Sequence, residues 1–211
     1  MMARFWRWIL VCTFAVAGIL CITQGMMAAS QQPDGVALVR QLEEAGPYAP
    51  ERFAGLTLAE KRTVLKALTP AYTTVRQIDK VAMTPLGRDG ITSYAAGWWA
   101  AEYAHDSYSD FDIHLWTFRN RIEWCGDDSV ITNVLGYRVI GTPHAPFWFY
   151  NGIRTENDLG GVGQPFYAHF AQGDFQLCMA GIKGVGCVLD KAPYIEMRGY
   201  ADGSSYRVSG V

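Results

Sequence analysis

Residues 111–152 read FDIHLWTFRNRIEWCGDDSVITNVLGYRVIGTPHAPFWFYNG, and this stretch decides the fold class of the chain. In its first part, apolar and polar side chains alternate with the period of two that is typical of a half-buried strand. The sequence CGDDS at 125–129 supplies short polar side chains and a glycine, as tight turns require. A second strand is predicted at 130–139, and the aromatic run at 147–150 indicates a third.

The remainder of the chain continues this pattern of short strands and turns. Further strands are predicted at 165–170, 175–178, 194–200 and 206–208. Asn151-Gly152 predicts a turn after the aromatic strand, 158–163 is expected to be a loop, and Asp202-Gly203 predicts a hairpin turn. Several short strands separated by turn signals are typical of an antiparallel sandwich. We therefore expect a mainly β fold, an antiparallel β-sandwich of the jelly-roll or Ig-like kind, over residues 89–211.

The region before these strands is predicted to be helical. Asp34 has the side chain and position to cap a first helix, and Thr57 with Glu60 has the spacing of a capping box for a second. Residues 71–83 are compatible with either strand or helix, because β-branched residues precede a stretch without a clear preference. We expect 31–88 to form a short helical N-terminal segment, either an arm or a pro-region.

Residues 1–30 have the pattern of a signal peptide. Arg4 and Arg7 precede an apolar run at 9–22, and small residues just before Gln31 fit a signal-peptidase site. The apolar run is shorter than the roughly 20 residues that a membrane-spanning helix needs. We therefore expect a secreted, extracellular protein that has no membrane association after the signal peptide is cleaved.

The charge of the chain argues against two classes of partner. The whole chain has a formal net charge of −2, and residues 1–30 contain two arginines and no acid, so the mature chain is more acidic still. Nucleic acids and anionic membranes are bound by basic surfaces. Neither is therefore expected as the main partner, although a local basic patch is compatible with this composition.

The mature chain contains three cysteines, which in an oxidising compartment suggests one disulfide bond and one spare thiol. The favoured pair is Cys178 and Cys187, because the glycine-rich segment between them can fold back on itself. A bond between Cys125 and Cys178 is the alternative, since spacing alone does not determine connectivity.

The order of these features resembles a group of small exported proteins of actinobacteria that have no assigned activity. The resemblance implies a fold and a compartment, and it carries over no catalytic residues. Asp128 departs from the pattern, because these proteins have a glycine at that place in the turn. The matching motifs are Leu68-Thr69-Pro70, Trp124-Cys125-Gly126-Asp127, Trp148-Phe149-Tyr150-Asn151-Gly152, Phe175-Gln176-Leu177-Cys178, Gly186-Cys187, Pro193-Tyr194-Ile195 and Asp202-Gly203.

Metal-binding patterns are weak in this sequence. The acids at 106–112 do not have the spacing of an EF-hand, so a solvated loop is expected there rather than a calcium site. The four histidines contain no pair at the helical spacing of zinc enzymes. We therefore predict no metal ion and no other cofactor.

Two sets of residues have side chains that could act together in catalysis. Cys125 with His144 or His169 would make a thiol dyad, but its neighbours Trp, Gly and Asp lack the positive charge that lowers a thiol pKa. Glu102 and Glu123 supply the two carboxylates that a glycosidase needs. Nothing in the sequence brings either pair together, so no catalytic residue is predicted.

Aromatic residues are the strongest functional signal, because they exceed what one core-facing side of a small sandwich holds. Exposed Trp and Tyr rings stack on sugars and form hot spots for proteins. Consecutive aromatics at 147–150 would point to both faces of a sheet. The alternative is that the N-terminal helices cover the second face. The predicted binding residues are Trp98, Trp99, His114, Trp116, Trp148 and Tyr150.

Together, these observations predict a secreted, non-catalytic binding or adaptor module. Its aromatic-rich sheet face would engage a partner protein or a cell-surface glycan at the cell envelope. The alternative is a secreted effector or antibacterial toxin component with hydrolase or membrane-damaging activity. The two differ in whether the aromatic face or a catalytic pair is presented to solvent.

Overall fold

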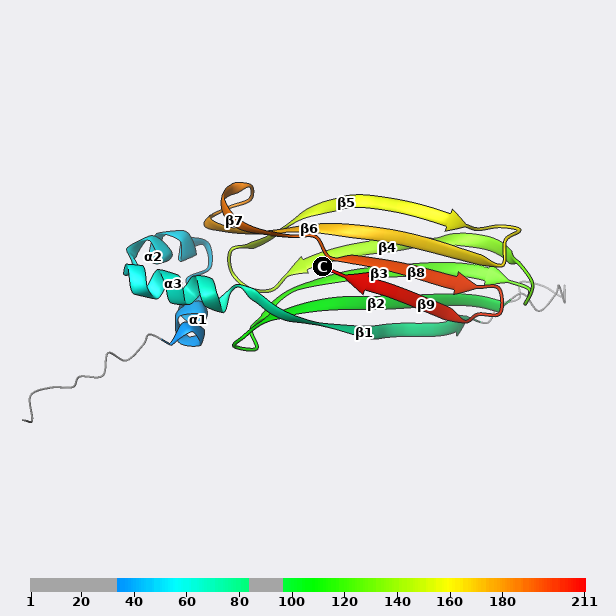
Figure 1. The fold of residues 1–211 in the computed structure, drawn as a ribbon, viewed down its shortest axis with the longest axis horizontal. Coiled ribbons are helices and arrows are strands. Elements are labelled where there is room, and N and C mark those ends of the chain that lie inside the picture. Colours follow the sequence, from blue (N-terminus) through cyan, green and yellow to red (C-terminus); the bar gives the residue numbers. More distant parts are fainter. Residues whose placement is uncertain (1–33, 84–96) are drawn as a thin grey trace, which may run out of the picture. The chain divides into compact units, whose positions relative to one another are not determined.

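A computed structural model describes residues 34–83 and 97–211 of the chain, in which two antiparallel sheets stack as a β-sandwich (Figure 1). The sandwich expected from the sequence is therefore confirmed. The predicted signal peptide at 1–30 lies outside the described residues. Among the helices within them, none is both long and apolar enough to span a membrane.

Each sheet is a run of neighbouring strands. The first sheet has the order β1-β2-β3-β4, from β1 (Pro70–Met83), β2 (Gly97–Ser109), β3 (His114–Gly126) and β4 (Ile131–Pro143). The second has the order β5-β6-β8-β9, from β5 (Trp148–Gly160), β6 (Phe166–Ile182), β8 (Tyr194–Tyr200) and β9 (Ser205–Gly210), and β7 (Val185–Lys191) pairs with the end of β6. The described strands thus form two up-and-down sheets, whereas jelly-roll and Ig-like sandwiches exchange strands between sheets.

From residue 34 onward, three helices and a 3₁₀ turn precede the first strand: α1 (Gly35–Ala45), η1 (Gly46–Tyr48), α2 (Ala49–Gly55) and α3 (Leu58–Ala67). Both predicted caps are present. Asp34 accepts a hydrogen bond from the Val36 amide at 3.0 Å. Thr57 and Glu60 form the reciprocal capping box, because each side chain accepts from the other's backbone N–H.

The helices pack at one end of the sandwich rather than over a sheet face. Phe53 of α2 packs on Phe147, with ring centroids 5.6 Å apart. The indole N–H of Trp148 donates to the Leu68 carbonyl at 3.1 Å, which joins the end of the helical region to β5. Pro50 fills the space beside Gly181, where a Cβ would lie only 2.1 Å from the proline ring.

The segment before the β domain is not wholly helical, because residues 70–83 form strand β1. This strand pairs antiparallel with β2 from Pro70 to Met83 and is an edge of the first sheet. The segment 31–88 therefore cannot be a separable arm in its entirety. The sequence left 71–83 undecided, and pairing with β2 resolved it, because β propensity depends on the neighbouring strand.

Two other boundaries differ from the sequence expectations. Asn151-Gly152 does not make a turn, because β5 continues through it with a register irregularity between Tyr150 and Gly152. The predicted strands at 165–170 and 175–178 are parts of the single long strand β6. By contrast, β8 spans the predicted 194–200, and the turns at 127–130 and 201–204 are both present.

The core lies between the two sheets and contains several tryptophan side chains. Trp116 and Trp124 are fully buried. Trp124 donates its indole N–H to the Tyr200 carbonyl at 2.8 Å. Its ring occupies the space left by Gly199, where a Cβ would lie 2.6 Å from the indole. The close approach of this ring to the facing strand explains why a glycine stands there.

A buried network of hydrogen bonds also joins the two sheets. Asn120 of β3 donates its amide N–H groups to the carbonyls of His169 and Ile195, at 3.3 and 3.0 Å. Its amide oxygen is therefore the group that faces His169 Nδ1 at 3.0 Å, so this nitrogen carries a hydrogen. His169 Nε2 lies 3.5 Å from Glu156. These bonds satisfy polar groups that would otherwise destabilise the core.

The predicted disulfide bond between Cys178 and Cys187 is present, and it closes the hairpin formed by β6 and β7. Cys125 is a free thiol. Exposed aliphatic side chains surround the hairpin, so the cross-link holds a region that has little core of its own. They are Ile182, Val185 and Val188.

Candidate functional site

The outer face of the first sheet is the best candidate for a functional surface. The described helices contact one another and β6, and the core contacts of β3 run to β6 and β8 of the other sheet. The sequence had left open whether the helices cover this face. In the described residues they lie at the end of the sandwich, so polar and aromatic side chains of β1–β4 face solvent.

A row of four stacked rings crosses this face from β1 to the residue after β4. Tyr72 stacks on Tyr108, and Tyr108 stacks on His114, with ring centroids 5.3 and 4.8 Å apart. His114 stacks on His144 at 4.0 Å. The first two contacts follow from strand register, because Tyr72 pairs with Tyr108 and Tyr108 pairs with His114. We call Tyr72, Tyr108, His114 and His144 the ring row.

A buried carboxylate supports the ring row from below. Asp106 is 1% exposed and accepts hydrogen bonds from Arg76 Nε and from the Thr117 hydroxyl, both at 2.6 Å. The hydroxyl of Thr117 also lies 3.0 Å from His114 Nε2 and 2.8 Å from His144 Nε2. Since the hydroxyl donates its single hydrogen to Asp106, both imidazoles donate to Thr117. The two rings are thereby held in fixed orientations.

The electrostatics of this cluster follow from burial and charge. Burial alone would raise the pKa of Asp106, but hydrogen bonds from Arg76 and Thr117 outweigh it and lower the pKa. The pKa of His144 is lowered by desolvation and, second, by the neighbouring His114. The carboxylate therefore stays ionised and His144 stays neutral near pH 7, which suits hydrogen bonding to polar ligands.

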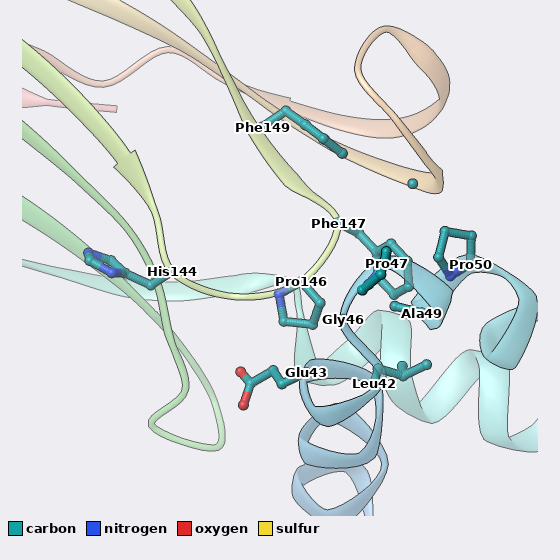
Figure 2. Close-up of a pocket in the computed structure, with 11 residues that line it drawn as sticks. Leu42, Glu43, Gly46, Pro47, Ala49, Pro50, His144, Pro146, Phe147 and Phe149 are labelled. Carbon is teal, nitrogen blue, oxygen red and sulfur yellow. The ribbon is translucent and has the colours of Figure 1, made fainter.

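The ring row ends at a cleft of about 540 Å³, shown in Figure 2. His144 lies at one side of this cleft, and the carboxylate of Glu43 on α1 approaches from the helical side. Burial raises the pKa of Glu43. The other lining side chains are apolar and come from α1, η1, α2, the segment before β5 and β5 itself: Leu42, Pro47, Ala49, Pro50, Pro146, Phe147 and Phe149.

Two predicted binding residues are core residues, so the expectation that they are exposed was wrong. Trp116 is 0% and Trp148 is 3% exposed. A β-bulge explains Trp116: the register shifts by one residue between the pairs Ser107–Trp116 and Tyr108–His114. The extra residue reverses the alternation, so His114 and Trp116 point to opposite faces. Trp148 is covered because the helical region packs over its end of β5.

The other four predicted binding residues are partly exposed. Trp98 and His114 lie on the outer face of the first sheet, in register with Cys125 and Tyr108 respectively. Trp99 points inward and packs on Trp124, with centroids 6.2 Å apart. Tyr150 packs on Phe175 at 5.0 Å. Only Trp98 and His114 thus remain on a face that a ligand can approach.

The thiol dyads suggested by the sequence are not formed. Cys125 lies near the end of β3, whereas the His144 amide bonds to Leu115 near its beginning, so a length of about 30 Å separates them. His169 points into the core. Burial raises the pKa of Cys125, which opposes thiolate formation. Among the described residues, no group of three or more His, Cys, Asp or Glu can hold a metal ion.

The structure does bring Glu102 and Glu123 onto one face. Both bind Arg121, whose Nε lies 2.7 Å from Glu123 and whose terminal nitrogen lies 3.6 Å from Glu102. Glycoside hydrolysis requires one carboxyl group to act as a protonated acid. Here both carboxylates are engaged by one arginine, so this arrangement favours an ion-pair network over a hydrolase site.

Sequence reasoning missed most of the ring row. Tyr72 lies in the segment whose secondary structure was undecided, and Tyr108 lies in a stretch interpreted as a loop. His144 was considered only as a catalytic or metal-binding residue. The stacking depends on which residues pair across strands, and a single sequence does not contain that register.

Comparisons with protein-family models, with curated proteins and with solved structures found no match for this chain. The resemblance to exported actinobacterial proteins therefore stays a prediction that rests on the motifs alone.

Three histidines whose pKa is lowered by desolvation predict that acid destabilises the fold. Desolvation lowers the pKa of His105, His144 and His169 below the unfolded value of about 6.5. The folded state then binds fewer protons than the unfolded state, so stability is highest above pH 6.5 and is lost as pH falls through the folded pKa values. We expect a lower urea midpoint at pH 5.5 than at pH 7.5. His169→Gln should reduce this difference, and equal midpoints for the unmodified chain would contradict the assignment.

Proposed function

We propose that this protein is an exported, non-catalytic binding module that recognises a cell-surface glycan through the ring row and the adjoining cleft. The observation that carries the proposal is the row of four stacked rings on a sheet face that the described helices leave uncovered. Stacked rings with fixed hydrogen-bonding groups between them form a pre-organised surface, which lowers the entropy cost of binding.

The geometry suits sugars because the apolar and polar features alternate over short distances. Among the described residues, the two end rings, Tyr72 and His144, each have one stacking partner, so one face of each is not covered by another ring. Sugar C–H groups pack on such faces. Asp112 accepts from the Tyr72 hydroxyl at 2.6 Å and offers further acceptor capacity to ligand hydroxyls.

The cleft adds a pocket of the usual ligand size. Its volume of about 540 Å³ lies within the range of small-molecule sites, which are mostly apolar with few polar groups. His144 belongs both to the ring row and to the cleft, so a chain of sugars would contact the two in succession. Glu43 would accept hydrogen bonds at the far side.

Export is part of the proposal. The signal-peptide pattern at 1–30 and a disulfide bond between Cys178 and Cys187 support an oxidising, extracellular compartment. Secretion is tested by mass spectrometry of the culture supernatant, which should find a mature chain beginning at Gln31.

Binding is tested on a glycan array and by calorimetry with the best oligosaccharide. We expect Tyr72→Ala and His144→Ala each to weaken binding by about tenfold, the loss of one stacking contact of about 1–1.5 kcal/mol. Tyr206→Ala is the matched control, because Tyr206 is exposed on β9 in the other sheet.

Three outcomes decide the proposal. Loss of binding in the ring-row variants with normal binding in the control supports it. An empty array together with capture of a protein that depends on Tyr72 would replace the glycan by a protein partner. An empty array and an empty pull-down would contradict a binding function on this face.

A further inference from the structure

We propose that Arg119 and Arg138 form an anion-binding subsite on the outer face of the first sheet, which takes a carboxylate or phosphate group of the ligand. The inference rests on the proposed function only for the identity of the larger ligand, an acidic glycan. The subsite itself follows from the arrangement of three arginines around one buried acid.

Three arginines converge on one buried carboxylate on this face. Arg121 of β3 lies directly opposite Arg138 of β4, and Arg119 is two residues before Arg121 on the same face. Like charges opposite each other destabilise a sheet. All three guanidinium groups lie within 4.0 Å of the single carboxylate of Glu102, whose side chain is only 6% exposed.

One arginine is fully engaged and two are not. Arg121 is 15% exposed and binds Asp79 at 3.2 Å and Glu123 at 2.7 Å in addition to Glu102. Arg138 has one long hydrogen bond of 3.4 Å to Glu102. Arg119 approaches Glu102 only at 4.0 Å. Arginine has five N–H donors, so within the described residues both of these groups retain unused donors.

Two further observations show that the unused donors are accessible and under-satisfied. The side chains of Arg119 and Arg138 are 36% and 60% exposed, whereas the carboxylate beneath them is buried. Among the described residues, the enclosed Nε of Arg119 has no hydrogen-bond partner. A buried donor without an acceptor is costly.

The surface beside these arginines is hollowed. A depression of about 380 Å³ lies over one part of the β3–β4 pairing and is lined by Arg121, Glu123 and residues 135–138. Gly136 contributes no side chain at its wall, and no atom lies within 4 Å of where its Cβ would be. An oxyanion with its attached carbon skeleton therefore has room to approach Arg138.

The chemistry of the arginines selects the ligand class. A guanidinium group binds carboxylate or phosphate oxygens through two parallel hydrogen bonds. Glu102 sits beneath the guanidinium groups and orients them, so the donors at the surface are the part that a ligand meets first. A glycan that crosses the face from the ring row would reach them, and an acidic substituent would be preferred over a neutral one.

The direct test is an NMR titration of the arginine Nε–Hε signals with inorganic phosphate, and separately with acetate, at low ionic strength. We expect saturable shifts at Arg119 and Arg138, and binding about tenfold weaker in Arg138→Ala. Arg138→Lys should bind with intermediate affinity, because lysine keeps the positive charge but lacks the paired N–H donors of a guanidinium group. Arg154→Ala is the control, since Arg154 is a half-exposed arginine with one ion pair on the other sheet.

The outcomes separate this inference from the proposed function. Equal shifts at all exposed arginines, including Arg154, or no saturation, would overturn the subsite even if glycans bind. Calorimetry with an acidic oligosaccharide and its neutral counterpart completes the test: preference for the acidic form should disappear in Arg138→Ala while neutral binding persists. Comparing phosphate with acetate shows which anion the subsite favours.

Discussion

Replacing Trp116 by alanine is expected to reduce the free energy of unfolding by about 3–5 kcal/mol, the usual cost of truncating a buried aromatic side chain. Trp116 is fully buried between the sheets and stacks on Phe175, with ring centroids 4.8 Å apart. It also meets the edge of Trp148 at 6.5 Å. Its removal leaves a cavity at the point where both sheets and the helical end of the core meet.

Two variants sharpen this measurement, which is made by urea unfolding. Trp116→Phe should lose less stability than Trp116→Ala, because it keeps an aromatic ring. It also removes an indole N–H that has no partner among the described residues. Trp98→Ala should also lose less stability than Trp116→Ala, since Trp98 is partly exposed on the outer face. Equal losses in Trp116→Ala and Trp98→Ala would show that the two faces of the first sheet have been assigned incorrectly.

Removal of the disulfide bond is expected to cost about 2–3 kcal/mol, the loop-closure estimate for a short cross-linked segment. Cys178 and Cys187 are nine residues apart and join β6 to β7. Without the bond, the hairpin depends on backbone pairing and on the contact of Gly181 with Pro50. We expect Cys178→Ala/Cys187→Ala to unfold at lower urea and the hairpin to exchange its amide hydrogens faster.

Cys125→Ala is the matched control for the disulfide, because Cys125 is the free thiol and forms no cross-link. It should leave amide exchange in the β6–β7 hairpin unchanged. A reducing agent should reproduce the effect of the double variant in the unmodified chain. If reduction leaves the urea midpoint unchanged, the bond does not contribute to stability as inferred.

Much of the fold was predictable from local patterns. Asp34, Thr57 and Glu60 have the residue types and spacing of caps, and the structure forms those caps. The acidic turn at 125–129 and the strand at 194–200 were also predicted, because turn residues and alternation act over a few positions. The disulfide pairing was favoured for a similar reason, since its partners are close in sequence.

The candidate site was much less predictable. The alternation of His114 and Trp116 in the sequence placed them on one face, and a bulge opposite Tyr108 separated them. The aromatic run at 147–150 lost its expected exposure because helices from earlier in the chain cover that end. In both cases the deciding contact joins residues far apart in sequence.

By itself, the sequence determined most of the strands, the hairpin turns at 127–130 and 201–204, and the capped helix ends, whereas 71–83 stayed undecided and the predicted turn at Asn151-Gly152 does not form. These features depend on backbone conformation and on neighbours within about four residues. The tertiary structure decided which side of each strand meets solvent, how Tyr72, Tyr108, His114 and His144 come into a row, and that three arginines share Glu102. Register and sheet packing set those relations, because the two sides of a strand differ only in what the rest of the chain places against them.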